Sequence, residues 1–406
     1  RGESEDAVQY SAVKLFLVSA RRARPDFELT ADNVVHVVRI CHLVEGMPLG
    51  ILLAAAWVGM LTPAEIADEI GRSLDFLETD LRGVPARQRS LRAAFDHSYH
   101  LLSEQERGVF QRLSVFRGGF TQDAAQQVAG GSLRELKALT DKSLLGRDPA
   151  GRYSIHEVLR GYAAEKLDQV PQEKIGTRDR HCSTYVRFLQ QREEELKGAG
   201  QGEALDEIAA EIDNVRAAWR WAIAQPRVAE IRQAAESLFR YYLIRTQVQE
   251  GEEAFAQAVA ALESPACQAG GWGAEREIAL GLALVFQGYL GYFIYSSERA
   301  RALVRRGLEV LRPLGARKEL ALAKWTAAYF DALESPAERA RLARESLAIY
   351  EELGDRSGVA RCYLDLGLGR PEGGYQREYL EKSLALSSEI GDRWCMAFAL
   401  FSLGEN

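Results

Sequence analysis

The sequence predicts a mainly α-helical chain: a helical domain, a winged-helix domain with a small β-hairpin, and an α-solenoid of tetratricopeptide-like helical hairpins. Three observations support this fold class. Helix-capping signals recur through the first third of the chain. One strong turn signal, "DPAG", separates two short apolar runs. A related pattern then returns about every 40 residues, which is typical of helical repeats.

The composition is that of a soluble protein from a reducing compartment. The 406 residues are 47% hydrophobic and 27% charged, and the net charge of −7 argues against a whole surface that binds nucleic acid or anionic lipid. The five cysteines are scattered and form no C-x-x-C pair, which indicates reduced thiols. The apolar run "PLGILLAAAWVGML" (48–61) is too short to span a membrane. We therefore expect a cytoplasmic location.

The helical domain is expected over residues 1–85. Thr30 is a candidate N-cap, Gly46 is a candidate glycine just beyond a helix end, and Pro48 suits the first turn of the next helix. Another helix is expected after Thr62, with Glu65 three residues later in the capping-box position.

The winged-helix domain is expected over residues 86–168. Two of its helices begin with the serine and glutamate of a capping box: Ser103 with Glu106, and Ser132 with Glu135. Apolar Leu144 and Leu145 precede the "DPAG" turn, and Tyr153 and Ile155 follow it, which predicts a β-hairpin. A helical bundle followed by a hairpin is the winged-helix arrangement.

A helical linker and the start of a superhelical sensor are expected over residues 169–265, and tetratricopeptide-like repeats over 266–406. Similar segments begin at Leu314, Leu353 and Ile390, which are 39 and 37 residues apart. Each unit is two amphipathic helices that must stack on their neighbours to bury a core. The repeat pattern is unfinished at the last residue and the chain starts abruptly, so we expect a fragment of a longer protein.

Several segments resemble the STAND class (NB-ARC-like) of signal-transduction ATPases and follow one another in the same order as in that class. The resemblance is to the branch of bacterial LuxR-type and SARP-type (AfsR-like) transcription regulators. Residues Gly46-Met47-Pro48-Leu49 resemble the GLPL motif. "SIHEVLRGYAAEKL" (154–167) resembles the MHD motif, with Ile155 and Glu157 in place of Met and Asp. "EIDNVRAAWRWAI" (211–223) resembles the opening of the family's sensor.

The resemblance implies nucleotide-binding roles, in the full-length protein, for His156, Gly46, Pro48 and Leu49, with ADP or ATP and Mg²⁺ as cofactors. The chain itself contains no G-x-x-x-x-G-K-[ST] and no Walker B strand, so we expect no cofactor and no enzymatic activity from it alone. The alternative is that His156 is a structural residue at a strand–helix junction and that 46–49 is an ordinary helix connection.

The winged helix raises the possibility of direct DNA binding through Arg134, Lys137 and Lys142. Glu135 and Asp141 on the same helix would face phosphates, which argues against it. His97 and His100 are three apart on a helix but lack a third ligand, so no metal site is predicted.

Exposed aromatic and arginine side chains on the concave face of a repeat array commonly bind ligands or partners. The aromatic residues of the repeats are expected to be mostly core. The ligand-facing role is assigned to the densest aromatic and arginine patch: Arg240, Arg245, Tyr289, Tyr292 and Arg299.

Together these observations predict the regulatory and sensor portion of a STAND-type transcription regulator. Its repeats would bind an inducer or a partner protein, and the winged helix would couple that binding to the nucleotide state. Activation would be accompanied by self-association. DNA would be bound by a domain outside this chain, and no membrane is expected. The alternatives are a stand-alone tetratricopeptide adaptor and a regulator that binds DNA through its own winged helix.

Overall fold

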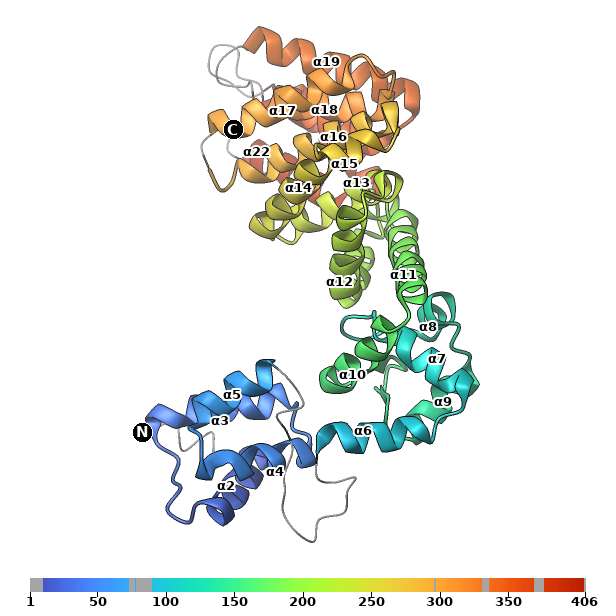
Figure 1. The fold of residues 1–406 in the computed structure, drawn as a ribbon. Coiled ribbons are helices and arrows are strands. Elements are labelled where there is room, and N and C mark those ends of the chain that lie inside the picture. Colours follow the sequence, from blue (N-terminus) through green and yellow to red (C-terminus); the bar gives the residue numbers. More distant parts are fainter. Residues whose placement is uncertain are drawn as a thin grey trace. The chain divides into compact units, whose positions relative to one another are not determined.

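The computed structural model describes residues 10–72, 77, 90–295, 297–330, 336–368 and 376–404. The chain forms two compact units, unit 1 (Arg1–Arg180) and unit 2 (His181–Asn406), coloured from blue to green and from green to red in Figure 1. The expected boundary at residues 85 and 86 lies outside the described residues. Among the helices that are described, none is long and apolar enough to cross a membrane.

Unit 1 begins with a group of helices that bury one shared core. These elements are α2 (Ser11–Ala23), α3 (Ala31–Leu43), α4 (Pro48–Ala56), a 3₁₀ turn η1 (Trp57–Gly59) and α5 (Pro63–Arg72). Helix α2 packs on α4, and α3 packs on α5. The expected start signals are confirmed: Pro48 is the first residue of α4, and the Thr62 backbone N–H donates to the Glu65 carboxylate at 2.8 Å.

The rest of unit 1 contains helices around one hairpin. Its elements are α6 (Leu91–His100), α7 (Glu104–Leu113), α8 (Gln122–Ala129), α9 (Leu133–Asp141), β1 (Gly146–Arg147), β2 (Tyr153–Ser154) and α10 (Glu157–Asp168). Both expected capping boxes are present: the Glu106 carboxylate accepts from the Ser103 N–H at 2.7 Å, and Glu135 accepts from the Ser132 N–H at 3.0 Å.

The expected hairpin is confirmed, with β1 antiparallel to β2 and Arg147 opposite Tyr153. The Asp148 carboxylate accepts from the Arg152 N–H at 2.8 Å, and Gly151 takes the left-handed conformation (φ 86°) that the turn requires. Phe120 pairs with Tyr153 through two backbone hydrogen bonds of 2.8 Å, which ties the hairpin to the helices.

Helix α11 (Pro171–Gln191) contributes residues to both units, and all later elements belong to unit 2. These are η4 (Glu195–Lys197), α12 (Gln201–Ala224), α13 (Val228–Ile244), α14 (Val248–Leu262), α15 (Pro265–Ala269), α16 (Gly273–Gly291), α17 (Ser297–Leu311), α18 (Arg317–Phe330), α19 (Pro336–Leu353), α20 (Arg356–Leu368), α21 (Arg377–Ile390) and α22 (Arg393–Gly404).

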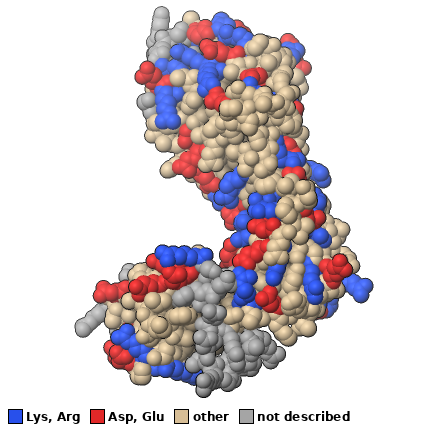
Figure 2. All heavy atoms as spheres, viewed as in Figure 1, with Lys and Arg blue, Asp and Glu red and all other residues tan. Residues whose placement is uncertain are grey.

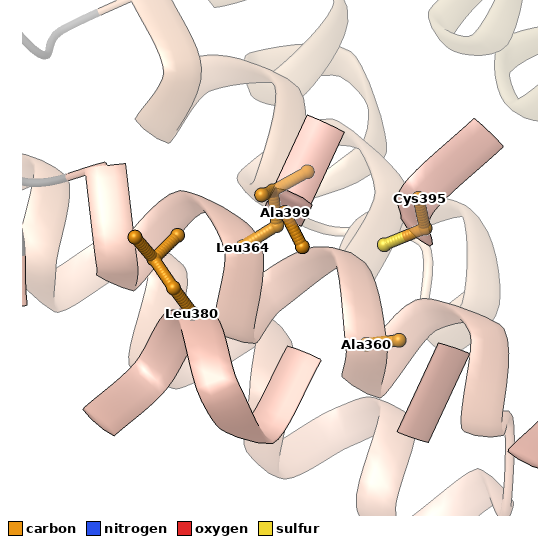
Figure 3. Packing of buried hydrophobic residues seen from close by; sticks show 5 residues of the cluster. All are labelled: Ala360, Leu364, Leu380, Cys395 and Ala399. Atoms are coloured by element: carbon orange, nitrogen blue, oxygen red, sulfur yellow. The ribbon is translucent and has the colours of Figure 1, made fainter. Parts of the chain in front are cut away.

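The expected helical hairpins are present. Helix α16 pairs with α17, α18 with α19, and α20 with α21, and each hairpin packs on the next. A Cβ on Gly307 would lie 2.7 Å from the Gly281 carbonyl, so α16 and α17 approach too closely there for a larger side chain. Further along, Leu364 and Leu380 pack with Ala360, Cys395 and Ala399 to join α20, α21 and α22 (Figure 3).

Helix α22 also contacts the start of α12. The Gln201 side chain donates to the Asp392 carboxylate at 3.2 Å and accepts from the Trp394 N–H at 3.2 Å. All three residues lie in unit 2, although about 190 residues of chain separate Gln201 from the other two. The last helix of unit 2 therefore lies next to the start of α12, near the beginning of the same unit.

Candidate functional site

The turn between α3 and α4 holds two consecutive residues in the left-handed region, Glu45 (φ 44°) and Gly46 (φ 71°). Gly46 adopts this conformation at little cost, whereas for a side chain such as Glu45 the cost is roughly 1–2 kcal/mol. The turn then leads directly into Pro48 at the start of α4. Glu45 is thus held by its surroundings in a conformation that it does not favour.

Those surroundings include His156, the N-cap residue of α10. Its Nε2 lies 3.4 Å from both the Glu45 backbone oxygen and the Glu45 Oε2. The Glu157 backbone N–H donates to the Glu45 Oε1 at 3.0 Å. We call these interactions the Glu45–His156 contact.

The position of this carboxylate follows from helix chemistry. The first N–H groups of a helix have no partner within the helix, and the positive end of the helix dipole favours an anion. The Glu45 carboxylate fills that role for α10. His156 Nδ1 is buried and finds no hydrogen-bond partner in the described part of the chain.

A hollow of 360 Å³ adjoins the Glu45–His156 contact. Its lining includes Glu45, Phe116, Gly119, Ile155, Glu157 and Arg160. Arg160 forms a bidentate pair with Glu157, its Nε lying 2.6 Å from Oε2, and the pair lowers the pKa of the Glu157 carboxyl. Arg160 also donates to the Ser114 backbone oxygen at 3.2 Å, which anchors the start of α10 to the end of α7.

The structure brings two of the sequence-predicted elements together, but through a residue that sequence reasoning missed. Gly46 and Pro48 are exposed and Leu49 is half-buried. The residue that touches His156 is Glu45, which precedes the predicted set. Nothing in the sequence pattern signals this contact, because the two residues are 111 positions apart.

A phosphate group does not fit this arrangement as it stands. The two donors that an anion would use, the His156 imidazole and the Glu157 N–H, both face the Glu45 carboxylate. A phosphate would be repelled unless Glu45 withdrew. What the geometry does provide is a polar link between the α3–α4 turn and the first turn of α10.

The predicted DNA-reading helix is α9. Lys137 pairs with Asp141 at 2.5 Å, and Lys142 pairs with Glu106 at 2.7 Å. Two of the three candidate basic side chains are therefore engaged by carboxylates. Figure 2 shows Lys and Arg side chains interspersed with Asp and Glu over the face drawn, whereas nucleic-acid interfaces usually have a continuous basic surface.

The predicted ligand-facing patch in unit 2 does not form one surface. Tyr289 is 3% exposed, stacks on Trp325 with ring centroids 5.6 Å apart and contacts Phe239 edge-on. It is a core residue, because α16 is covered by α13, α14, α17 and α18. Arg240 is also buried and pairs with Glu236 at 3.1 Å.

The other three predicted residues lie nearer the surface. Tyr292 is 38% exposed. Arg245 pairs with Asp206, and the Arg299 guanidinium lies 4.3 Å from the ring centroid of Tyr295. These positions do not converge with Tyr289 and Arg240 on a common exposed site.

No group of three or more His, Cys, Asp and Glu side chains suited to a metal ion occurs among the described residues. His97 and His100 lie on α6, as their spacing predicts. Both are exposed.

No protein-family model matches the chain. Proteins of Mycobacterium tuberculosis and Mycobacterium bovis named "Putative HTH-type transcriptional regulator" are 29% identical to it over 413 residues, which cover 97% of this chain and 41% of each relative. The chain thus spans about two fifths of the length of these curated relatives. A second Mycobacterium tuberculosis protein, whose name states no function, is 34% identical over 203 residues, 47% of this chain and 50% of its own length.

Among solved structures, the chain matches a STAND protein with a tetratricopeptide repeat sensor from Pyrococcus horikoshii. The match has a TM-score of 0.33 and 13% identity, and it covers 96% of this chain and 62% of that one. The sequence similarity places the chain near proteins named as transcriptional regulators.

Proposed function

We propose that this chain is the regulatory and sensor portion of a STAND-type transcription regulator. Unit 2 binds an inducer or a partner protein, and unit 1 couples that event to the nucleotide state of an ATPase core elsewhere in the full-length protein. The chain itself is not catalytic. DNA is bound by another part of the full-length protein, and activation is accompanied by self-association.

The observation that carries this proposal is the Glu45–His156 contact. It joins the segment that resembles the GLPL motif to the segment that resembles the MHD motif. Regulatory coupling needs an element with two arrangements that ligands stabilise differently. A contact made by one half-exposed carboxylate, held in an unfavourable backbone conformation, can be broken at modest cost and is suited to such an element.

The relatives named as transcriptional regulators support the regulatory part of the proposal. They are more than twice as long as this chain, which agrees with the idea that nucleotide and DNA binding reside in other segments. The ion pairs on α9 argue against the alternative in which this chain reads DNA itself.

The proposal is tested in the full-length protein by His156→Ala and Glu45→Gln. His97→Ala is the matched control, because His97 is exposed and lies on α6, outside the Glu45–His156 contact. We expect both test variants to change the amount of ADP that co-purifies by at least about fivefold, in line with typical coupling energies. His97→Ala should retain ADP as the parent does. Unchanged retention in both test variants would contradict the proposal.

The stand-alone adaptor is distinguished by the gene sequence that precedes the codon of Arg1. A P-loop about 150–200 residues upstream, within the usual length of one domain, is what the proposal requires. Its absence would leave the adaptor as the better interpretation.

A further inference from the structure

Unit 2 contains a hollow of 380 Å³ that none of the predicted ligand residues identified. This volume falls in the range of about 300–1,000 Å³ that is usual for small-molecule sites. The side chains that line it come from α11, α13, α16, α18 and α19, so distant parts of the repeat array converge on it. It is unrelated to the Glu45–His156 contact, which lies in unit 1.

The floor of the hollow is apolar. Leu282 and Leu322 are 5% and 4% exposed, and Tyr350 is 2% exposed. The Tyr350 ring lies against Gly358, where an added Cβ would come within 2.4 Å of it, so the ring packs directly on the backbone of α20. The Tyr350 hydroxyl makes no hydrogen bond to any described residue and lines the hollow, where a polar group could reach it.

The charged side chains of the wall are almost all paired. Glu236 is deeply buried and lies 3.0 Å from Lys318, 3.1 Å from Arg240 and 3.5 Å from Lys197, and these cations hold the pKa of its carboxyl well below the usual value. Lys318 also pairs with Glu193, a second carboxylate of the lining.

Arg232 pairs with Glu319 at 2.7 Å on the same wall. Glu275, in the first turn of α16, is the exception. It is half-buried, lines the hollow and forms no ion pair or side-chain hydrogen bond with a described residue.

We propose that this hollow binds a small organic amine. A protonated amino group would neutralise Glu275, which is the one lining carboxylate that has no opposite charge among the described residues. A short apolar body would cover Leu282, Leu322 and the Tyr350 ring, and a polar group on the ligand would satisfy the Tyr350 hydroxyl. This inference rests on the proposed sensor function and supplies the chemical class of its ligand.

The test uses three probes of similar shape and different charge: 2-phenylethylamine, 2-phenylethanol and 3-phenylpropanoate. Their dissociation constants for the whole chain are measured by titration calorimetry. We expect the amine to bind about tenfold more tightly than the alcohol, with the carboxylate weakest, because only the amine places a positive charge beside Glu275. Equal binding of the three probes, or no detectable binding of the amine, overturns the proposal.

Variants locate the site. Glu275→Gln should weaken amine binding about tenfold. Tyr350→Phe should leave it unchanged, because 2-phenylethylamine has no second polar group that could reach the Tyr350 hydroxyl. Glu298→Gln is the matched control, because Glu298 is an exposed acid in the first turn of α17 outside the hollow. An amine affinity that falls equally in Glu298→Gln and Glu275→Gln would contradict the assignment.

The unfolding midpoint of each variant is recorded, so that a loss of binding can be separated from a loss of structure. If the amine fails to bind while His156→Ala still alters ADP retention, the ligand class is wrong and the proposed function stands. If the amine binds but His156→Ala leaves ADP retention unchanged, the ligand class stands and the proposed function is wrong.

Discussion

In unit 1 the Glu45 carboxylate meets its partners at a contact where its own side chain is 42% exposed, whereas the Glu236 carboxylate of unit 2 is 13% exposed and lies among three cations. The first arrangement depends on one acid, one imidazole and one backbone N–H. The second includes the buried Arg240, whose only ion pair among the described residues is with Glu236, whereas Lys197 and Lys318 also pair with Glu193. The Glu45–His156 contact can therefore open at low cost, whereas the Glu236 ion pairs must remain formed for unit 2 to stay folded.

The largest effect is expected from breaking the buried arrangement. Glu236→Ala would leave the buried Arg240 without its carboxylate partner, while Lys197 keeps Glu193, and this should lower the free energy of unfolding of unit 2 by about 4 kcal/mol. Urea denaturation followed by tryptophan fluorescence measures this, since five of the six tryptophans lie in unit 2. A loss below 1 kcal/mol would show that the cluster is not needed for stability.

The next effect separates the core of unit 2 from its surface. Tyr289→Ala should destabilise unit 2 by about 3 kcal/mol, because it removes a buried ring that stacks on Trp325. Tyr292→Ala, three residues away and 38% exposed, should cost less than about 1 kcal/mol. The same urea denaturation applied to both variants compares them, and equal losses would contradict the placement of Tyr289 in the core.

The third prediction concerns pH. Burial raises the pKa of Asp365 to about 7, and Arg339 and Arg361 only partly oppose this. Since the unfolded carboxyl titrates near pH 4, the folded chain binds a proton between about pH 4 and 7 that the unfolded chain has released. The unfolding free energy contributed by Asp365 therefore falls as pH rises through this window and is constant above it.

Asp365→Asn removes the carboxyl group that takes up this proton. We expect the loss of stability between pH 5 and pH 7.5 to be smaller in Asp365→Asn than in the parent by about 2 kcal/mol. Urea denaturation at the two pH values provides the comparison. An identical pH dependence in the two proteins would rule out the buried Asp365 as its source.

The smallest effect is expected in unit 1. Glu45→Gln keeps an oxygen that can accept from the Glu157 N–H but removes the charge next to His156 and the helix dipole. We expect unit 1 to lose about 1 kcal/mol, the usual size of a helix N-terminal interaction. The measurement is thermal unfolding of unit 1 monitored through Trp57, compared with Glu104→Gln as a second helix N-terminal acid.

The local features of this fold could be predicted from sequence, because their causes lie within a few residues. The capping boxes at Ser103 and Ser132, the hairpin turn and the repeated helix pairs each follow from short patterns. The positions of Tyr289 and Arg240 could not be predicted in this way. Their burial depends on which helices cover α13 and α16, and this is a tertiary property that the local sequence does not reveal.

The candidate sites show the same limit. Sequence resemblance drew attention to His156 and to residues 46–49, but the contact is made by Glu45 from 111 positions away. The hollow in unit 2 depends on residues from five helices, and Glu275 stands out only because its neighbours are paired. No spacing rule connects such residues.

The most direct test of the account is hydrogen exchange at the Glu157 backbone amide, measured by NMR. This N–H is the first of α10 and has no acceptor within the helix, so any protection must come from the Glu45 carboxylate. We predict slowing of at least about tenfold relative to an unstructured amide in the parent chain, lost in Glu45→Ala. Exchange of the Glu157 amide at the unstructured rate in the parent chain would contradict the Glu45–His156 contact and the function proposed from it.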